Sequence, residues 1–435
     1  MSAHPPITAA LHQAKGDLFK SQGDLTAAIA SYQQALALDP NANEVKTALG
    51  SAYLAQAMLL QQSGDIAAAT RQHLKALTQF PRLFNAYSRL RYNLLRYDIA
   101  EGSPLFQEVA ETCQAILAKH PNILPAKITL AYALTKLGRS QNAIHCYRSI
   151  TGSPDAASRR PPDFIILGAE KSGTTSLYQY LRSHPQFRPP VEKEIDFFDL
   201  EYRYGIDWYL SHFPPADIEA AEKRQTSQTE TSKAEASLAP TNWITGETSA
   251  NYLYSDVAPA RIFEHFPDIK LAVILRNPVD RTISRYNMMV RNGAEKRDFA
   301  TAIAAEMATI QQATNGDDIA WRALNRCRHI GNSLYYHHLK RWLSLFSREQ
   351  LIVLKSEDLF SQPEQTMQQF YSQLGIASDC SQQQYPPHNA GEYQPADSDI
   401  RQQLADFFIP YNHQLEALLA QSFSWQSTAL SSAAS

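Results

Sequence analysis

The sequence predicts two domains of different class. Residues 1–155 are expected to form an all-α solenoid of helical repeats, and residues 163–426 an α/β domain with a central parallel sheet. In the first part, small residues recur in segments that end at prolines. In the second, short apolar runs alternate with helical segments, which is typical of a parallel sheet with crossover helices. A stretch rich in Pro and Ser separates the two parts, and we place a linker at residues 156–162.

The repeats of the first domain carry small residues where paired helices must pack closely. Copies end at Pro40 and Pro81, and the interval from Pro121 to Pro154 is 33 residues. The pattern resembles tetratricopeptide repeats, whose period is about 34 residues, and about four units would fit. The 41 residues between Pro40 and Pro81 exceed that period, so we expect an insertion of about two helical turns near Ala55–Gln61.

Two interpretations of this repeat domain remain open. Stacked helix pairs present an extended concave surface, which favours the docking of a protein or peptide partner. The alternative is a helical scaffold that binds nothing.

A glycine-bearing loop, GAEKSGTTS at residues 168–176, follows the apolar run 164–167. We expect a strand, a turn and then a helix that begins at Thr174 or Thr175. The N–H groups and the positive end of such a helix attract an anion, usually a phosphate. The residues available to bind it are Lys171, Ser172, Gly173, Thr174, Thr175 and Ser176. The alternative is an ordinary strand-turn-helix whose hydroxyls only cap the helix.

This loop differs at one position from the P-loop of nucleotide triphosphatases. Their motif is G-x-x-x-x-G-K-[ST], with a lysine directly after the second glycine. Here Gly168 and Gly173 keep the spacing, but Thr174 follows them, and Lys171 lies inside the loop. The sequence therefore predicts a P-loop-type anion site for a phosphate-bearing donor other than ATP.

Three segments between the first two expected strands are mostly polar. Residues 191–199 (VEKEIDFFD) alternate charged and apolar residues, which predicts a short extended segment at a cleft edge, with Glu194 as a candidate general base. The alternative is a surface strand with its charges in solvent. Residues 218–240 lack large apolar side chains after the first, so we expect a flexible insertion. Residues 243–252 predict a turn with an acid and hydroxyls.

The apolar run 270–275 predicts the second strand, and a helix is expected at residues 279–290. Arg276 follows the strand at its carboxyl end, where ligands bind in open α/β sheets. Ser284 lies eight residues later on the helix, and an arginine with a hydroxyl can bind a phosphate. The alternative is a solvated basic helix, with Arg285 and Arg291 among its surface residues.

The last elements complete the sheet and the domain. Residues 350–354 predict a third strand and residues 363–374 a helix. Residues 400–423 predict an amphipathic helix or a helix pair, and the Ser/Ala-rich residues 427–435 a disordered tail.

Composition excludes several classes of function. The net charge is −3 and charged residues make up 19% of the chain, so no bias toward nucleic acid appears. The 4 cysteines are scattered without a C-x-x-C pair, and no HExxH motif occurs, so we expect no metal site. We see neither a signal peptide nor an apolar run of about 18 residues, and therefore expect a cytoplasmic protein without a membrane span.

Six segments in order over residues 160–426 resemble sulfotransferases that use 3'-phosphoadenosine 5'-phosphosulfate (PAPS). The heparan-sulfate-type and related bacterial enzymes are the most similar. The segments are GAEKSGTTSL, KEIDFFD, YGIDWYLSHFP, ILRNPVDRTISRY, GNSLYYHHLKRWLSLF with QLIVLKSEDL, and PYNHQLEALL with FSW. The resemblance implies a PAPS-dependent sulfotransferase domain, and N-terminal repeats occur among its bacterial members.

The resemblance also implies how the donor is bound. Lys171 would contact the 5'-phosphosulfate and stabilise the leaving phosphate, and residues 172–176 would cradle it through N–H groups and hydroxyls. Arg276 and Ser284 would hold the 3'-phosphate, which distinguishes this donor from ATP. Tyr335, in the segment GNSLYYHHL, would belong to the same donor site.

Glu194 matches the family's catalytic glutamate. It would accept the proton of the acceptor hydroxyl during an in-line transfer that requires no metal. A base buried in the pocket would need a raised pKa to act near neutral pH.

Two departures leave the acceptor open. Glycan-modifying members have a second catalytic lysine in a Glu-Lys-Thr-Pro segment, whereas Thr248 follows Glu247 here. Residues 388–391 (HNAG) stand in the region of a basic donor-binding loop. The acceptor hydroxyl is that of a glycan, a protein tyrosine, a lipid or a metabolite, and the repeats favour a macromolecule. The alternative functions are an atypical P-loop kinase and a repeat-based binding protein with an inactive sulfotransferase domain.

Overall fold

The computed structural model of the protein describes residues 8–97, 99–152, 159–216, 242–316, 318–378, 384–386 and 397–425. The expected insertion at 218–240 and tail at 427–435 lie outside the described residues, as do the start of the linker and the segment at 388–391. The chain divides into two compact units, Met1–Pro154 and Asp155–Ser435. Each unit is described by itself below.

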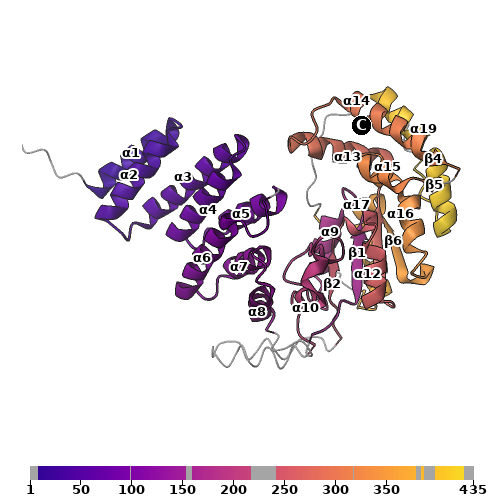
Figure 1. Ribbon diagram of the computed structural model, residues 1–435, viewed down its shortest axis with the longest axis horizontal. Coiled ribbons are helices and arrows are strands. Elements are labelled where there is room, and N and C mark those ends of the chain that lie inside the picture. Colours follow the sequence, from indigo (N-terminus) through magenta and orange to yellow (C-terminus); the bar gives the residue numbers. More distant parts are fainter. Residues whose placement is uncertain are drawn as a thin grey trace, which may run out of the picture. The chain divides into compact units, whose positions relative to one another are not determined.

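The first unit is built from helices, shown in indigo to purple in Figure 1. They are α1 (Ala9–Ser21), α2 (Leu25–Leu38), α3 (Asn43–Gln62), α4 (Ile66–Gln79), α5 (Phe84–Arg96), α6 (Pro104–Lys119), α7 (Leu124–Lys136) and α8 (Ser140–Thr151). Consecutive helices pack against each other from α1 to α5 and from α6 to α8, and α5 contacts α7. This is the all-α repeat architecture that the sequence predicts.

Close packing explains the small residues of the repeats. A Cβ atom at Gly16 in α1 would lie 2.5 Å from the ring of Tyr32 in α2, so only glycine fits there. The Tyr32 ring is buried, and its hydroxyl donates to Asp17 at 2.7 Å. Helix α3 has 20 residues and runs through Ala55–Gln61, whereas α1 has 13. The expected insertion is therefore an extension of one helix.

The second unit contains a four-stranded parallel sheet in the order β2-β1-β3-β6. Its strands are β1 (Phe164–Gly168), β2 (Gly246–Thr248), β3 (Lys270–Leu275) and β6 (Leu351–Lys355). A separate antiparallel pair joins β4 (Thr314–Asn315) to β5 (Asp318–Ile319). The central strands β1 and β3 are almost entirely buried, which is why they are continuous apolar runs.

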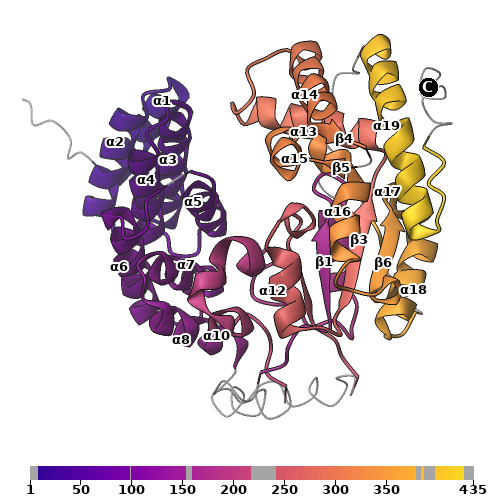
Figure 2. The same cartoon turned by 45° about the vertical axis from the view of Figure 1, so that its right-hand side comes forward.

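Helices flank the parallel sheet (Figures 1 and 2). They are α9 (Thr174–Arg182), α10 (Ile206–Leu210), α12 (Ala258–His265), α13 (Pro278–Arg291), α14 (Phe299–Ala313), α15 (Trp321–Arg326), α16 (Tyr335–Trp342), α17 (Ser356–Ser361), α18 (Pro363–Leu374) and α19 (Ser398–Leu419). Apolar side chains of α9 and α18 pack on β1, β3 and β6 in one core. A second core joins α13, α14 and α19. No described helix has both the length and the apolar composition needed to cross a bilayer.

Two local predictions were wrong. Residues 243–252, expected as a turn, contain the short parallel strand β2. Residues 191–199, expected to be extended, end in a π-helical turn at Phe197–Glu201. Its aromatic residues are buried against Tyr209 and Tyr252, and this packing overrides the alternating charge pattern.

Candidate active site

The glycine-bearing loop lies at the carboxyl end of β1 and leads directly into α9. Gly173 precedes the helix with φ of 102°, a conformation suited to glycine, and a Cβ atom there would lie 3.2 Å from the Phe360 ring. Because Gly173 has no side chain, the first N–H groups of α9 have no side-chain cap. Uncapped N–H groups at the positive end of a nine-residue helix are a ready anion site.

Two arginines of α13 hold this loop in place through Glu170. Arg281 donates from Nε to the Glu170 carbonyl oxygen at 3.1 Å, and its Nη2 lies 3.7 Å from the Glu170 carboxylate. Arg285 forms a second ion pair with the same carboxylate. Both arginines are buried, so of the two arginines named for the alternative of a solvated helix, only Arg291 is exposed. The arginines therefore hold the loop, and a ligand would meet its other side.

Arg276 reaches the loop as its position after β3 predicts. Its Nη1 donates to the carbonyl oxygen of Lys171 at 3.3 Å. The hydroxyl of Tyr335, at the start of α16, donates to the Arg276 carbonyl oxygen at 3.0 Å, and burial raises the pKa of this phenol. Ser284 is buried on α13 between Arg281 and Arg285. The structure thus brings Lys171, Arg276 and Tyr335 together.

A lysine that the sequence analysis did not select joins the loop to the candidate base. Lys193 Nζ lies 3.2 Å from Thr175 Oγ1 and 2.8 Å from Glu194 Oε1. Glu194 therefore lies next to the glycine-bearing loop. Its side chain is 49% exposed, so it is not the buried carboxylate considered above. The sequence signals for Lys193 were the alternating charges of residues 192–194 and its place at the start of the segment KEIDFFD.

A buried carboxylate on β2 holds the segment that carries Lys193 and Glu194. Glu247 accepts hydrogen bonds from Tyr209 at 2.9 Å, Ser249 at 3.0 Å and Tyr252 at 3.3 Å. The hydroxyls of Ser249 and Tyr252 accept in turn from the backbone N–H groups of Asp196 and Phe198, each at 3.1 Å.

The residue after Glu247 ties the same segment to β2. Thr248 donates its N–H to the Lys193 carbonyl oxygen at 3.2 Å. The Glu247 network and this bond together fix the backbone from Lys193 to Phe198.

Burial raises the pKa of Glu247 to about 7, although its three hydroxyl partners act in the opposite direction. Burial also raises the pKa of Asp199 to about 6, and that of Asp196 well above its ordinary value. These carboxyls favour the protonated state in the fold. Their contribution to the free energy of unfolding is fully present below about pH 4, where these carboxyls are protonated in the folded and the unfolded chain. It is lost as the pH rises through about 7.

We expect the Glu247→Gln variant to show a flatter dependence of stability on pH than the natural protein. Each ionisable group of this kind contributes a slope of at most about 1.4 kcal/mol per pH unit between its unfolded and folded pKa values. Denaturant unfolding of both proteins from pH 4.5 to 8 measures the slopes. Because Asp196 and Asp199 remain in the variant, the difference reports Glu247 together with its effect on the pKa of Asp196, and parallel curves would refute the raised pKa of Glu247.

The described residues contain no cluster of three or more His, Cys, Asp or Glu side chains suited to a metal ion. His338, which is adjacent to His337 on α16, is buried and bonds to the Gly331 carbonyl oxygen at 2.9 Å.

Comparison with known proteins gives the family of this site. A model of the sulfotransferase domain matches residues 161–388, just over half of the chain, and a TPR repeat model matches residues 16–56. The membrane-associated sulfotransferase kil1 of Dictyostelium discoideum is 25% identical over 334 residues, covering 61% of this chain and 66% of that protein. The heparan sulfate glucosamine 3-O-sulfotransferase 3B1 of Mus musculus is 28% identical over 294 residues, covering 62% and 66%.

Two further relatives cover a similar share of the chain. The bifunctional heparan sulfate N-deacetylase/N-sulfotransferase 1 of Mus musculus is 30% identical over 299 residues, covering 61% of this chain and 30% of that protein. A sulfotransferase crystal structure from Alicyclobacillus acidocaldarius is 29% identical, covers 61% of this chain and 99% of that one, and has a TM-score of 0.43. The chain spans just under two thirds of kil1 and of the 3-O-sulfotransferase. On the family match, the chain belongs to the sulfotransferase family, with tetratricopeptide-type repeats before its sulfotransferase domain.

Proposed function

We propose that this enzyme transfers a sulfuryl group from PAPS to a hydroxyl group of its acceptor. The convergence of Arg276 and Lys193 on the uncapped loop before α9 carries this proposal. One cation comes from the end of β3 and the other from the segment before η1 (Phe197–Glu201). A donor with phosphates at two positions needs anion-binding groups on two sides of the site.

Each side chain has a place in the proposed transfer. The N–H groups of residues 174–176 and the hydroxyls beside them would bind the 5'-phosphosulfate, with Lys171 stabilising the charge on the leaving phosphate. Arg276 and Ser284 would hold the 3'-phosphate. Tyr335 would support Arg276, because its hydroxyl donates to the carbonyl oxygen of Arg276. The acceptor oxygen forms a bond to sulfur as the bond from sulfur to the phosphate oxygen breaks, which leaves adenosine 3',5'-bisphosphate.

Glu194 would accept the hydroxyl proton during this step. Lys193 holds the carboxylate beside Thr175 of the loop, so base and donor would be positioned by one side chain. We propose that Lys193 also supplies positive charge in place of the lysine that Thr248 has replaced. Lys193 lies within hydrogen-bond distance of the loop, which is where charge develops in the transition state.

Calorimetric titration tests the donor assignment. We expect adenosine 3',5'-bisphosphate to bind without metal and more tightly than ATP with Mg²⁺. If Arg276 binds the 3'-phosphate, Arg276→Gln should lower the affinity for the bisphosphate by about 10- to 100-fold, as for loss of a charged hydrogen bond, and leave that for adenosine 5'-monophosphate nearly unchanged.

Arg291→Gln is the matched control, because Arg291 is exposed at the end of α13. A preference for magnesium ATP would contradict the proposed donor and favour a kinase. If Arg276→Gln lost the same affinity for adenosine 3',5'-bisphosphate as for adenosine 5'-monophosphate, the assignment of Arg276 to the 3'-phosphate would be refuted. The proposed donor would not be affected by that result.

A further inference from the structure

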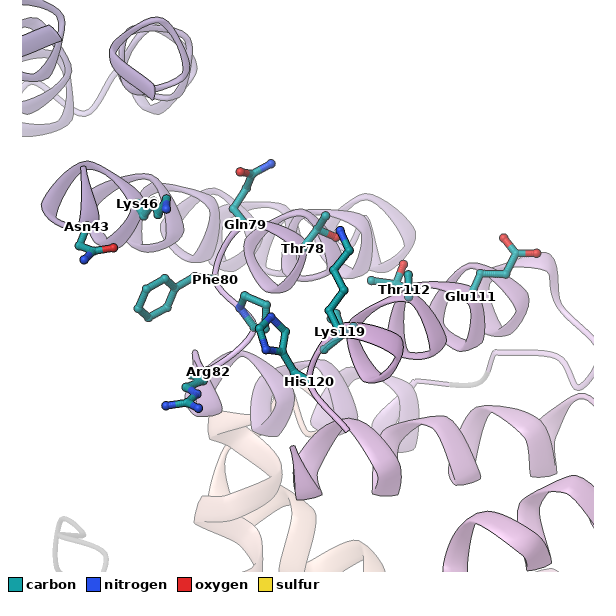
Figure 3. A pocket seen from close by; sticks show the side chains of 13 residues that line it. Asn43, Lys46, Thr78, Gln79, Phe80, Arg82, Glu111, Thr112, Lys119 and His120 are labelled. Atoms are coloured by element: carbon teal, nitrogen blue, oxygen red, sulfur yellow. The ribbon is translucent and has the colours of Figure 1, made fainter. Parts of the chain in front are cut away.

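The repeat unit contains a groove that is lined by cationic side chains. It consists of two adjoining hollows of about 670 Å³ and 500 Å³, which share Arg82, Lys119 and His120. Figure 3 shows the larger hollow, with Lys46, Phe80 and Arg82 among the side chains around it. We call the two hollows together the basic groove. The first turn of α3, the last turn of α4 and the second half of α6 line it.

Cations dominate the charged side chains of the basic groove. Lys46, Arg82 and Lys119 line it, with Glu111 as the one acid among the lining residues. None of the three cations forms an ion pair among the described residues. The charge extends to the whole unit, because residues 1–154 contain 14 Lys and Arg but 9 Asp and Glu, although the full chain has a net charge of −3. The groove therefore complements an anionic partner.

The helices that begin at the basic groove add positive partial charge to it. The helices α3, α5 and α7 begin with Ala42, Leu83 and Ile123 as N-caps and have no side-chain cap. The intervening helices α2, α4 and α6 are capped by Asp24, Asp65 and Ser103. Residues from the first turns of α3, α5 and α7 line the two hollows. Uncapped helix starts attract carboxylates or other anions.

Lys46 cannot be explained by the stability of its own helix. It lies in the first turns of α3, where the helix dipole disfavours a cation. Lys119, in the last turn of α6, is by contrast favourable for its helix. The stability of α3 therefore does not favour Lys46 at this position, whereas a bound anion would.

Apolar side chains also line the basic groove. Phe80 and Ile116 line the larger hollow, and Phe84 and Leu124 line the smaller one. The side chains of Phe84 and Leu124 are 56% and 48% exposed, which is high for large apolar residues. Apolar side chains of a peptide would bury this surface, whereas a sulfated glycan offers mostly polar and charged groups to it.

We propose that the basic groove binds an acidic peptide segment of a partner protein, with carboxylates around an apolar side chain. The carboxylates would meet Lys46, Arg82, Lys119 and the helix starts, and the apolar side chain would enter between Phe80 and Phe84. The proposal concerns the repeat unit alone and is independent of the proposed sulfotransferase reaction.

The test is selection from a phage library of random 12-residue peptides on the immobilised full-length protein, followed by titration of the selected peptide. We expect enrichment of Asp and Glu around Phe, Leu or Ile, and weaker binding as salt rises. The key variant is Lys46→Glu, because an acid near the start of α3 should preserve helix stability. Lys46→Glu should lower the affinity for the selected peptide at least tenfold, and Arg82→Glu should do the same.

Lys75→Glu, on the exposed face of α4, is the matched control and should bind the peptide like the natural protein. Thermal unfolding of each variant separates loss of binding from loss of fold. The proposal is overturned if no acidic sequence is enriched, or if Lys46→Glu and Arg82→Glu bind as tightly as Lys75→Glu. A heparin octasaccharide that binds more tightly than the peptide and depends on the same two cations would assign the groove to a glycan instead.

Discussion

Replacing Lys171 with alanine should lower kcat/KM by at least about 100-fold, because the variant would lose the cation that we propose stabilises the charge on the leaving phosphate. Affinity for adenosine 3',5'-bisphosphate should fall by about 10- to 100-fold, as expected for loss of a charge-assisted hydrogen bond. Lys171 is inside the loop rather than after Gly173, and its carbonyl oxygen is held by Arg276. Steady-state kinetics with PAPS and calorimetry with the bisphosphate give the two quantities.

The backbone of Lys171 offers a control that separates the fold from function. Its φ of 70° is a left-handed conformation that costs a non-glycine residue about 1 kcal/mol. Alanine keeps that cost, whereas Lys171→Gly removes it. We expect Lys171→Gly to be as stable as the natural protein or more stable, and as inactive as Lys171→Ala. If either variant bound the bisphosphate and turned over normally, Lys171 would have no part in the donor site.

The strands that could be predicted from the sequence are those whose residues form continuous apolar runs. The strands β1, β3 and β6 are apolar runs followed by helices, and they lie within one residue of their predicted bounds. The strand β2 could not be found in this way because its three residues include Glu247 and Thr248. Their burial depends on Tyr209 and Tyr252, and Tyr209 lies 38 residues away in the chain.

The same distinction applies to the site. The loop and Arg276 could be placed together from sequence because both follow parallel strands, whose carboxyl ends share one edge of the sheet. The contact from Lys193 to Thr175 and the ion pair from Arg285 to Glu170 span 18 and 115 residues. No local pattern records such contacts. As a result, the proximity of the loop and Arg276 was predictable, and the groups that hold them in place were not.

Glu194→Gln should retain donor binding and lose turnover, since the amide keeps the shape of the carboxylate but cannot accept a proton. A positioned general base contributes about 10²- to 10⁴-fold, and we expect a loss in that range. Single-turnover kinetics with saturating PAPS, together with bisphosphate calorimetry, measure both effects. Glu364→Gln, exposed in the first turn of α18, is the matched control. Normal turnover in Glu194→Gln would refute the base assignment.

A double-mutant cycle with Lys193→Gln extends this prediction to the pair. Lys193 contacts both Thr175 and Glu194, so its loss should weaken the positioning of the base as well as the charge at the loop. If the two side chains act as a unit, the double variant should turn over about as slowly as Glu194→Gln alone, because effects within a unit are not additive. If the two losses multiplied instead, Lys193 would act on the donor independently of the base.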